Sequence, residues 1–172
     1  MIEKSTVQKV LAAFFEQPSA KFHLRELSRI LGLSMPTIIS TTDTLSQEGL
    51  INKIKGKVLT QVAANRENAI FTQSKRVDNL ERIYGSGILE YLSALYNRPK
   101  LIILFGSYSR GEDIEESDID IAIVTTRRPH LDLSKYEKKL KRKISIHELA
   151  LENLSGDFKA NLANGIVLEG SW

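Results

Sequence analysis

The chain has 172 residues, with 24 Lys and Arg against 21 Asp and Glu, a formal net charge of +3, and no cysteine. The lack of cysteine excludes disulfides and thiol chemistry, so any metal must be bound by oxygen or histidine. No apolar run approaches the roughly 20 residues of a membrane span, and the first residues lack the layout of a signal peptide, so we expect a cytoplasmic protein with no membrane contact.

The charge is distributed unevenly between the two halves of the chain. Residues 1–84 contain twelve Lys and Arg against eight Asp and Glu, which gives +4, and residues 85–172 contain twelve against thirteen, which gives −1. Only the N-terminal half therefore has a reason to meet polyanions through its charge, and at this size the attraction is weak.

The first predicted elements are three helices. Apolar residues recur at three- and four-residue spacing in the first of them, which Pro18 closes. Gly32 ends the second helix, and Ser34 is a suitable N-cap for the third. The expected helices cover residues 5–17, 24–31 and 34–48. A tight glycine turn between the last two predicts a helix-turn-helix arrangement.

The segment that follows, residues 51–72, has β-branched runs around Gly56 and around 65–68, which predict a wing. Residues 5–72 then resemble the winged helices of MarR- and ArsR-like DNA-binding families. The presumed recognition helix contains no Lys or Arg, so the bidentate arginine contact with guanine is not available there. Protein interaction or dimerisation is the alternative role. The candidate DNA contacts are Thr37, Ser40, Thr41, Lys53, Lys55 and Lys57.

The second half of the chain predicts alternating helices and strands. A linking helix at residues 73–85 leads to the sequence YGSG, the best candidate for a boundary, so we expect domains at 1–72 and 86–172. The overall class is α+β, with a small mixed sheet in the second domain. The expected order is helix 87–96, strand 101–105, a strand ending at 124, helix 133–142, strand 143–148, helix 151–162 and strand 166–169.

Asp118 and Asp120 stand in an apolar run that otherwise suits a buried strand. Side chains alternate along a strand, so the two carboxylates should share one face while Ile119 and Ile121 share the other. Two adjacent carboxylates repel each other, and a divalent cation that prefers oxygen converts this repulsion into coordination. The pair therefore predicts a magnesium or manganese site.

The turn between the two strands complements this pair. Gly106 lets a ligand approach the backbone, and Ser107 opens a helical turn whose amides favour phosphate, with Arg110 one turn away. The Walker A alternative fails because Glu112 and Asp113 stand where Lys and Ser or Thr are needed. The acidic run EDIEES at residues 112–117 is expected to be a solvated loop.

Gly106 and Ser107, then ten residues, then Asp118-x-Asp120, resemble the signature of the DNA polymerase beta-type nucleotidyltransferase superfamily in its minimal form. The resemblance implies a polymerase-beta-like domain over residues 86–172 that uses a nucleoside triphosphate. It implies nucleotide contacts from Gly106, Ser107, Arg110 and Ser117. Asp118 and Asp120 would be catalytic residues and metal ligands.

The same resemblance implies a third carboxylate from a following strand. In this sequence that strand is KISIHEL, where alternation places Ser145 and His147 on one face and Glu148 on the other. No acid falls beside the aspartate pair by alternation. The candidate substitutes are His147 and, at the strand end, Glu148.

Two functions remain open from the sequence, with a purely structural interaction protein as a third. The first is a magnesium-dependent enzyme that transfers an NMP, most simply AMP, from an NTP to a hydroxyl of a protein, RNA or small molecule. Minimal proteins that resemble this domain often act as antitoxins that modify a toxin, so a protein acceptor is expected by analogy. The alternative is a winged-helix transcriptional regulator, in which a degenerate transferase domain senses nucleotide. A homodimer would suit a palindromic operator.

Overall fold

The fold is described from a computed structural model, which describes residues 4–56, 60–150 and 156–172. The chain divides into two compact units, Met1–Asp78 and Asn79–Trp172. The division falls inside helix α4 (Ala69–Ser86), a few residues before the YGSG sequence at which the boundary was expected. Helix α4 is also longer than the linking helix predicted at residues 73–85. None of the described helices has the length and hydropathy to cross a membrane.

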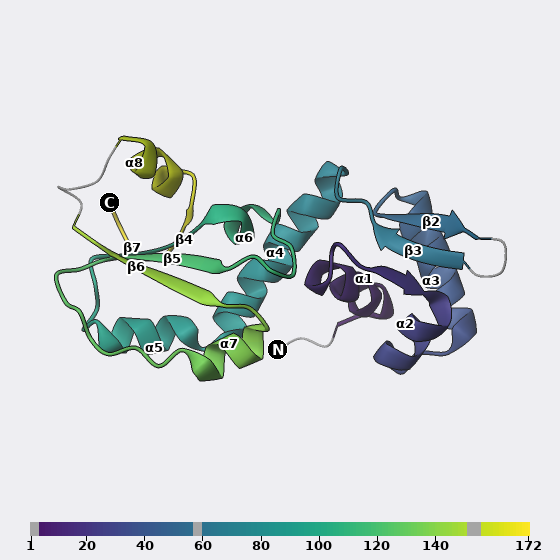
Figure 1. Cartoon of the computed structure of the whole chain (residues 1–172), viewed down its shortest axis with the longest axis horizontal. Helices are drawn as coiled ribbons and strands as arrows, with labels where there is room; N and C mark the ends of the chain where they lie inside the picture. The colour runs from purple at the N-terminus through teal and green to yellow at the C-terminus, as the bar shows by residue number, and fades with distance from the viewer. Residues whose placement is uncertain (1–3, 57–59, 151–155) are drawn as a thin grey trace. The chain divides into compact units, whose positions relative to one another are not determined.

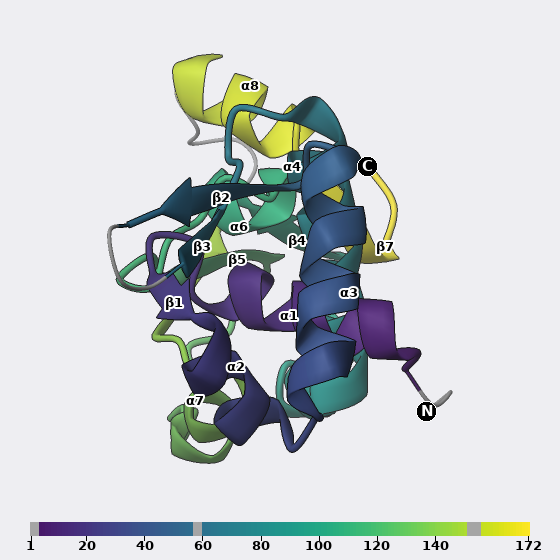
Figure 2. The same cartoon turned by 90° about the vertical axis from the view of Figure 1, so that its right-hand side faces the viewer.

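The three helices expected in the first unit are confirmed. Ser5 caps the first through a reciprocal pair of hydrogen bonds with Gln8, and the Ser34 hydroxyl accepts a hydrogen bond from the Thr37 amide at the start of the third. Gly32 ends the second in the left-handed conformation. These helices are α1 (Thr6–Glu16), α2 (Leu24–Leu31) and α3 (Met35–Gln47), and they face the viewer in Figure 2.

The first unit also contains a three-stranded antiparallel sheet in the order β1-β3-β2. Strand β1 (Lys21–His23) was not predicted, and β2 (Ile51–Lys55) pairs with β3 (Thr60–Ala64). Residues 65–68 form a turn and not a strand. The sheet and helices enclose one core, which includes Val10, Phe14, Phe22, Leu27, Ile38, Leu45 and Val62.

The second unit is built on a small mixed sheet, as expected. Its strand order is β6-β5-β4-β7, with β5 and β6 parallel and the other pairs antiparallel. All five residues of β4 are buried because helices cover both faces of the sheet. The strands are β4 (Leu101–Phe105), β5 (Ile119–Val124), β6 (Ile144–Leu149) and β7 (Ile166–Gly170).

Helices α5 (Ile88–Leu95) and α7 (Ser134–Leu140) lie on one face of this sheet, and α8 (Gly156–Ala163) lies on the other (Figure 1). Ile119, Ile121 and Ile123 pack in the core under α5 and α7. Ala122 and Val124 pack in the smaller core under α8. The alternation predicted for this strand is therefore confirmed, and the aspartates lie on the α8 face.

Candidate active site

The candidate site lies where β4 ends and β5 begins. Phe105, the last residue of β4, pairs with Asp120, and Asp120 pairs in turn with Ser145 of the parallel strand β6. Residues opposite each other in neighbouring strands point to the same face, so these side chains share one surface. Asp118, just before β5, is exposed, and the Asp120 side chain is 29% exposed. The pair is thus open to ligand at the sheet end.

Each aspartate is held by a side chain of β6. The Ser145 hydroxyl donates to Oδ2 of Asp118 at 2.9 Å. Nε2 of His147 lies 3.1 Å from Oδ1 of Asp120, and with an ionised carboxylate the ring N–H is the donor. Each contact leaves the other carboxylate oxygen available. The two strands therefore orient both carboxylates.

The Gly-Ser turn touches the aspartate pair directly. Gly106 starts the short helix α6 (Gly106–Arg110) with φ +73°, a conformation that suits glycine. A Cβ on Gly106 would lie 2.5 Å from Oδ2 of Asp120, which is closer than such atoms approach in proteins. Only a residue without a side chain permits this contact. The fold thus brings together the two parts of the predicted motif.

Aromatic side chains border the same region. The His147 ring meets the edge of Phe105 at 5.1 Å between centroids, and Phe105 meets Phe158 of α8 at 5.7 Å. Phe105 is buried, while Phe158 is half-buried. This apolar side restricts the motion of His147, so the ring is held both by packing and by its bond to Asp120.

The other residues expected at the nucleotide are engaged locally. The exposed Arg110 pairs through Nε with Oε2 of Glu112 at 2.7 Å. Oγ of Ser117 accepts a hydrogen bond from the Ile114 amide at 3.0 Å, which stabilises the loop before Asp118. Ser107 is half-buried at the start of α6. An exposed ion pair of this kind contributes little and breaks readily, so Arg110 can turn toward a phosphate.

Glu148 is not brought to the aspartate pair. It lies within β6 on the opposite face, where its Oε1 accepts from the Tyr96 hydroxyl at 2.6 Å and its Oε2 from Arg128 at 2.8 Å. Burial raises the pKa of the Tyr96 phenol, and its hydrogen bond to Glu148 raises it further, so the phenol stays protonated. Of the two substitutes for a third acid, only His147 reaches the site.

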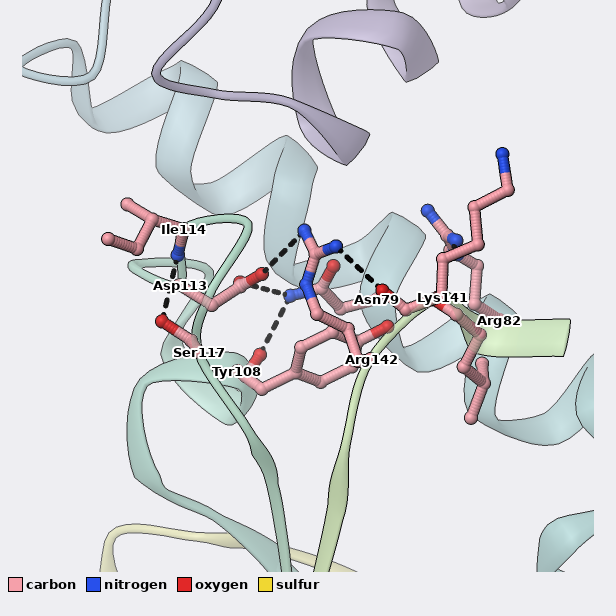
Figure 3. Close-up of polar contacts among 9 residues, drawn as sticks. Asn79, Arg82, Tyr108, Asp113, Ile114, Ser117, Lys141 and Arg142 are labelled. Carbon is pink, nitrogen blue, oxygen red and sulfur yellow. Dashed lines mark hydrogen bonds and ion pairs between the residues drawn. The ribbon is translucent and has the colours of Figure 1, made fainter. Parts of the chain in front are cut away.

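A buried polar network fixes the loop between α6 and β5 (Figure 3). The Asn79 amide on α4 donates to the Tyr108 carbonyl of α6 at 2.9 Å and to Oδ1 of Asp113 at 2.7 Å. Nη2 of Arg142 lies 3.9 Å from Oδ2 of Asp113, whose residue is 1% exposed. The expectation of a solvated acidic run is wrong at Asp113. Sequence reasoning missed this network because its members lie far apart along the chain.

The donor set suits a hard divalent cation. No cluster of three or more His, Asp or Glu side chains that could hold a metal occurs among the described residues. Magnesium usually takes one or two protein carboxylates and completes its shell with water and substrate phosphate. Asp118 and Asp120 are two carboxylates of this kind, and the backbone of Gly106 lies beside Asp120.

The candidate DNA contacts of the first unit are only partly accessible. Thr41 is buried, whereas Ser40 is exposed and the Thr37 hydroxyl lies 2.7 Å from that of Ser34. Lys53 pairs with Asp43 of α3 at 2.7 Å. Lys57 lies outside the described residues, and nothing is described of the Lys55 side chain. The structure thus removes Thr41 from the surface that could meet a base.

Comparison with known proteins bears on the second unit. Residues 86–160 match the family model described as a nucleotidyltransferase domain. A stretch of 41 residues is 58% identical to a protein of Methanocaldococcus jannaschii named a protein adenylyltransferase, and it covers 22% of this chain and 41% of that relative. No solved structure is significantly similar to the chain. The Gly-Ser turn and the aspartate pair both lie within the segment that matches this family model.

Proposed function

We propose that the protein is a magnesium-dependent nucleotidyltransferase that transfers AMP from ATP to a hydroxyl group. The contact between Gly106 and Asp120 carries the proposal, because it joins the turn expected at the phosphates to the carboxylates expected at the metal. The name of the partial relative supports adenylate as the transferred group and a protein as the acceptor. RNA and small molecules remain the other acceptor classes.

In the proposed reaction the acceptor oxygen forms a bond to the α-phosphorus of ATP while the bond to pyrophosphate breaks. The acceptor proton leaves with solvent, and the products are the adenylylated acceptor and pyrophosphate. Asp118 and Asp120 would hold magnesium, which neutralises charge on the phosphates when it is bound. Ser145 and His147 keep the two carboxylates oriented, so little reorganisation is needed during transfer.

Residues beside the aspartate pair would assist the transfer by contacting the phosphates and by holding His147 in place. Gly106 allows the phosphates to approach the backbone, and Arg110 can exchange its exposed partner Glu112 for a phosphate oxygen. Phe105 and Phe158 pack against His147. Catalysis would therefore depend on positioning and on charge neutralisation, as in other phosphoryl transfers.

Calorimetric titration of the whole protein with ATP, and then with the other three NTPs, tests the proposal. We expect ATP binding that requires magnesium and is lost in EDTA and in Asp120→Asn. ATP labelled at the α-phosphate should then label a macromolecule in a cell extract with wild-type protein and not with Asp120→Asn. Absence of binding to all four NTPs would contradict the proposal.

A second candidate is a nucleotide sensor. His147, and not a carboxylate, stands beside Asp120, while Glu148 is bound on the opposite face, and this favours binding without efficient transfer. In that case ATP would bind with magnesium and no label would move to any acceptor. The labelling experiment therefore separates the two candidates.

For the first unit we propose a winged-helix fold that binds DNA. Helices α2 and α3 joined at Gly32, followed by the β2–β3 hairpin, support this proposal. Contacts would come from Thr37 and Ser40 on α3 and from the lysines of the hairpin. A fluorescence titration with random duplex DNA should show binding that weakens steeply with salt.

A further inference from the structure

Helix α4 has an unusual distribution of side chains. Three of its large apolar residues, Ile70, Val77 and Tyr84, are 59%, 68% and 45% exposed. Its polar residues Lys75, Asp78, Asn79 and Ser86 are buried. Buried polar groups and exposed large apolar groups are the informative exceptions to the usual pattern. The exposed side of α4 therefore carries more apolar surface than solubility requires.

The three exposed residues are seven residues apart. Two further residues lie on the same face of the helix: Gln73, which is exposed, and Leu80, which is half-buried. Successive residues of this face are therefore three and four positions apart in turn. This is the spacing of the a and d positions of a coiled coil, and one helix face at this spacing can pack along a second helix. We call the face the α4 seam, and it consists of Ile70, Gln73, Val77, Leu80 and Tyr84.

The opposite side of α4 is already used by the chain itself. Phe71 packs in the core of the first unit, and Ile83 packs in the core of the second. Asn79 donates to Tyr108 and Asp113. The α4 seam is thus not needed to hold the helix in place. An exposed apolar face of this kind is typical of a surface that binds another molecule.

We propose that the α4 seam joins two copies of this chain, with the two α4 helices parallel and related by a two-fold axis. In a parallel coiled coil, the residue before one a position faces the residue five places later on the partner helix. Those positions are Arg76 and Glu81, which are exposed and of opposite charge. A two-fold axis forms the pair twice, so the seam is complementary to itself in charge as well as in apolar spacing.

A membrane surface is a poorer occupant of the same face. Amphipathic helices that lie on membranes carry Lys and Arg along the flanks of the apolar face. Here one flank residue is Arg76 and the other is Glu81, so an anionic surface would attract one and repel the other. The balance of charge favours a second helix of the same sequence.

The inference does not rest on the proposed transfer reaction. An α4 of 18 residues is about 27 Å long, too short for a stable isolated coiled coil. Both ends of this helix, however, are already ordered by packing within the chain, so pairing costs little additional order. A pair of chains would also present two copies of the first unit, which suits a two-fold symmetric DNA site.

Sedimentation equilibrium of the full chain tests the interface first. We expect a dimer, and we expect Val77→Lys to raise its dissociation constant at least 100-fold. Ile30→Lys is the matched control, because Ile30 is 58% exposed on α2 and lies outside the seam, and it should leave the dimer unchanged. Circular dichroism should show that all variants are folded. A monomeric wild type at 100 µM or above, or an unaffected dimer in Val77→Lys, would overturn the proposal.

Charge exchange and crosslinking test the register. Arg76→Glu and Glu81→Arg should each weaken the dimer, and the double variant should restore it to near the wild-type level. Because the chain has no cysteine, Ile70→Cys should give a disulfide-linked dimer on mild oxidation only in the parallel arrangement. Antiparallel helices would hold the two cysteines about 20 Å apart. Failure of the double variant to recover, absence of the crosslink, or equal crosslinking of Ile30→Cys would contradict the register.

Discussion

Nε2 of His147 lies 3.1 Å from Oδ1 of Asp120, and the two residues belong to neighbouring parallel strands. Asp118 has the corresponding partner in Ser145, two residues earlier on the same strand. Strand β6 therefore supplies one orienting group for each carboxylate of the pair. These two hydrogen bonds help to hold two negatively charged side chains next to each other at the start of β5. His147 is therefore the first residue to substitute.

Two substitutions of His147 distinguish the effect of its hydrogen bond to Asp120 from the effect of its side-chain volume. His147→Ala should weaken binding of ATP with magnesium by about 10- to 100-fold, because a hydrogen bond to a charged group contributes about 1.5 to 3 kcal/mol. His147→Gln retains a side-chain N–H donor and should recover affinity to within about threefold of wild type. Calorimetry on the three proteins measures this. Tighter binding in His147→Ala would mean instead that the histidine competes with the metal.

Gly106→Ala should abolish nucleotide binding. The new Cβ would lie 2.5 Å from Oδ2 of Asp120, so the carboxylate must move away from its present position. Gly32→Ala is the control for backbone strain, because Gly32 has a similar φ of +62° but no atom near its added Cβ. Both variants should lose about 1 to 2 kcal/mol of stability from the left-handed backbone. Retained affinity in Gly106→Ala would count against the assigned phosphate site.

Asn79→Ala should destabilise the second unit. The substitution removes the amide that donates to the Tyr108 carbonyl and to Asp113, and each buried acceptor that loses its donor costs about 1 to 3 kcal/mol. Denaturant unfolding measures the loss. Asn164→Ala removes an exposed asparagine whose side-chain amide donates to the nearby Ala160 carbonyl, and its effect should stay within about 0.5 kcal/mol. Equal stability of the two variants would contradict the role of the network.

Changing Lys53, Lys55 and Lys57 together to Ala should flatten the salt dependence of DNA binding. Each phosphate contact contributes about 0.9 to the slope of log affinity against log salt, so the slope should fall by nearly three units. Replacement of Lys100, Lys138 and Lys159 in the second unit is the control. An unaltered slope in the hairpin variant would mean that this hairpin does not meet DNA.

Local signals predicted most of the elements. Helix α2 begins and ends where the sequence indicates, because Gly32 supplies an unambiguous end, and strand β4 lies at the expected residues because its apolar run is continuous. Strand β1 was missed because three residues carry no detectable alternation. Such a strand forms only through its pairing with β3, which is distant in the sequence.

The site was predictable where a single strand determines it. Alternation correctly placed His147 and Ser145 on one face of β6, and it placed Glu148 on the other. The burial of Asp113 could not be predicted, because a carboxylate in an acidic run is usually solvated. It accepts a hydrogen bond from Asn79, 34 positions earlier, and forms an ion pair with Arg142, 29 positions later, and these residues meet only in the folded unit.

The position of Asn79 sets a practical limit on dissecting the protein. The segment that matches the nucleotidyltransferase model begins at residue 86, whereas the amide that holds the loop before Asp118 belongs to a residue seven places earlier. A fragment cut at the family boundary would also lose Ile83, which is fully buried in the same core. Expression of the second unit by itself should therefore begin before Asn79, and a shorter fragment that fails to bind nucleotide would say nothing about the intact protein.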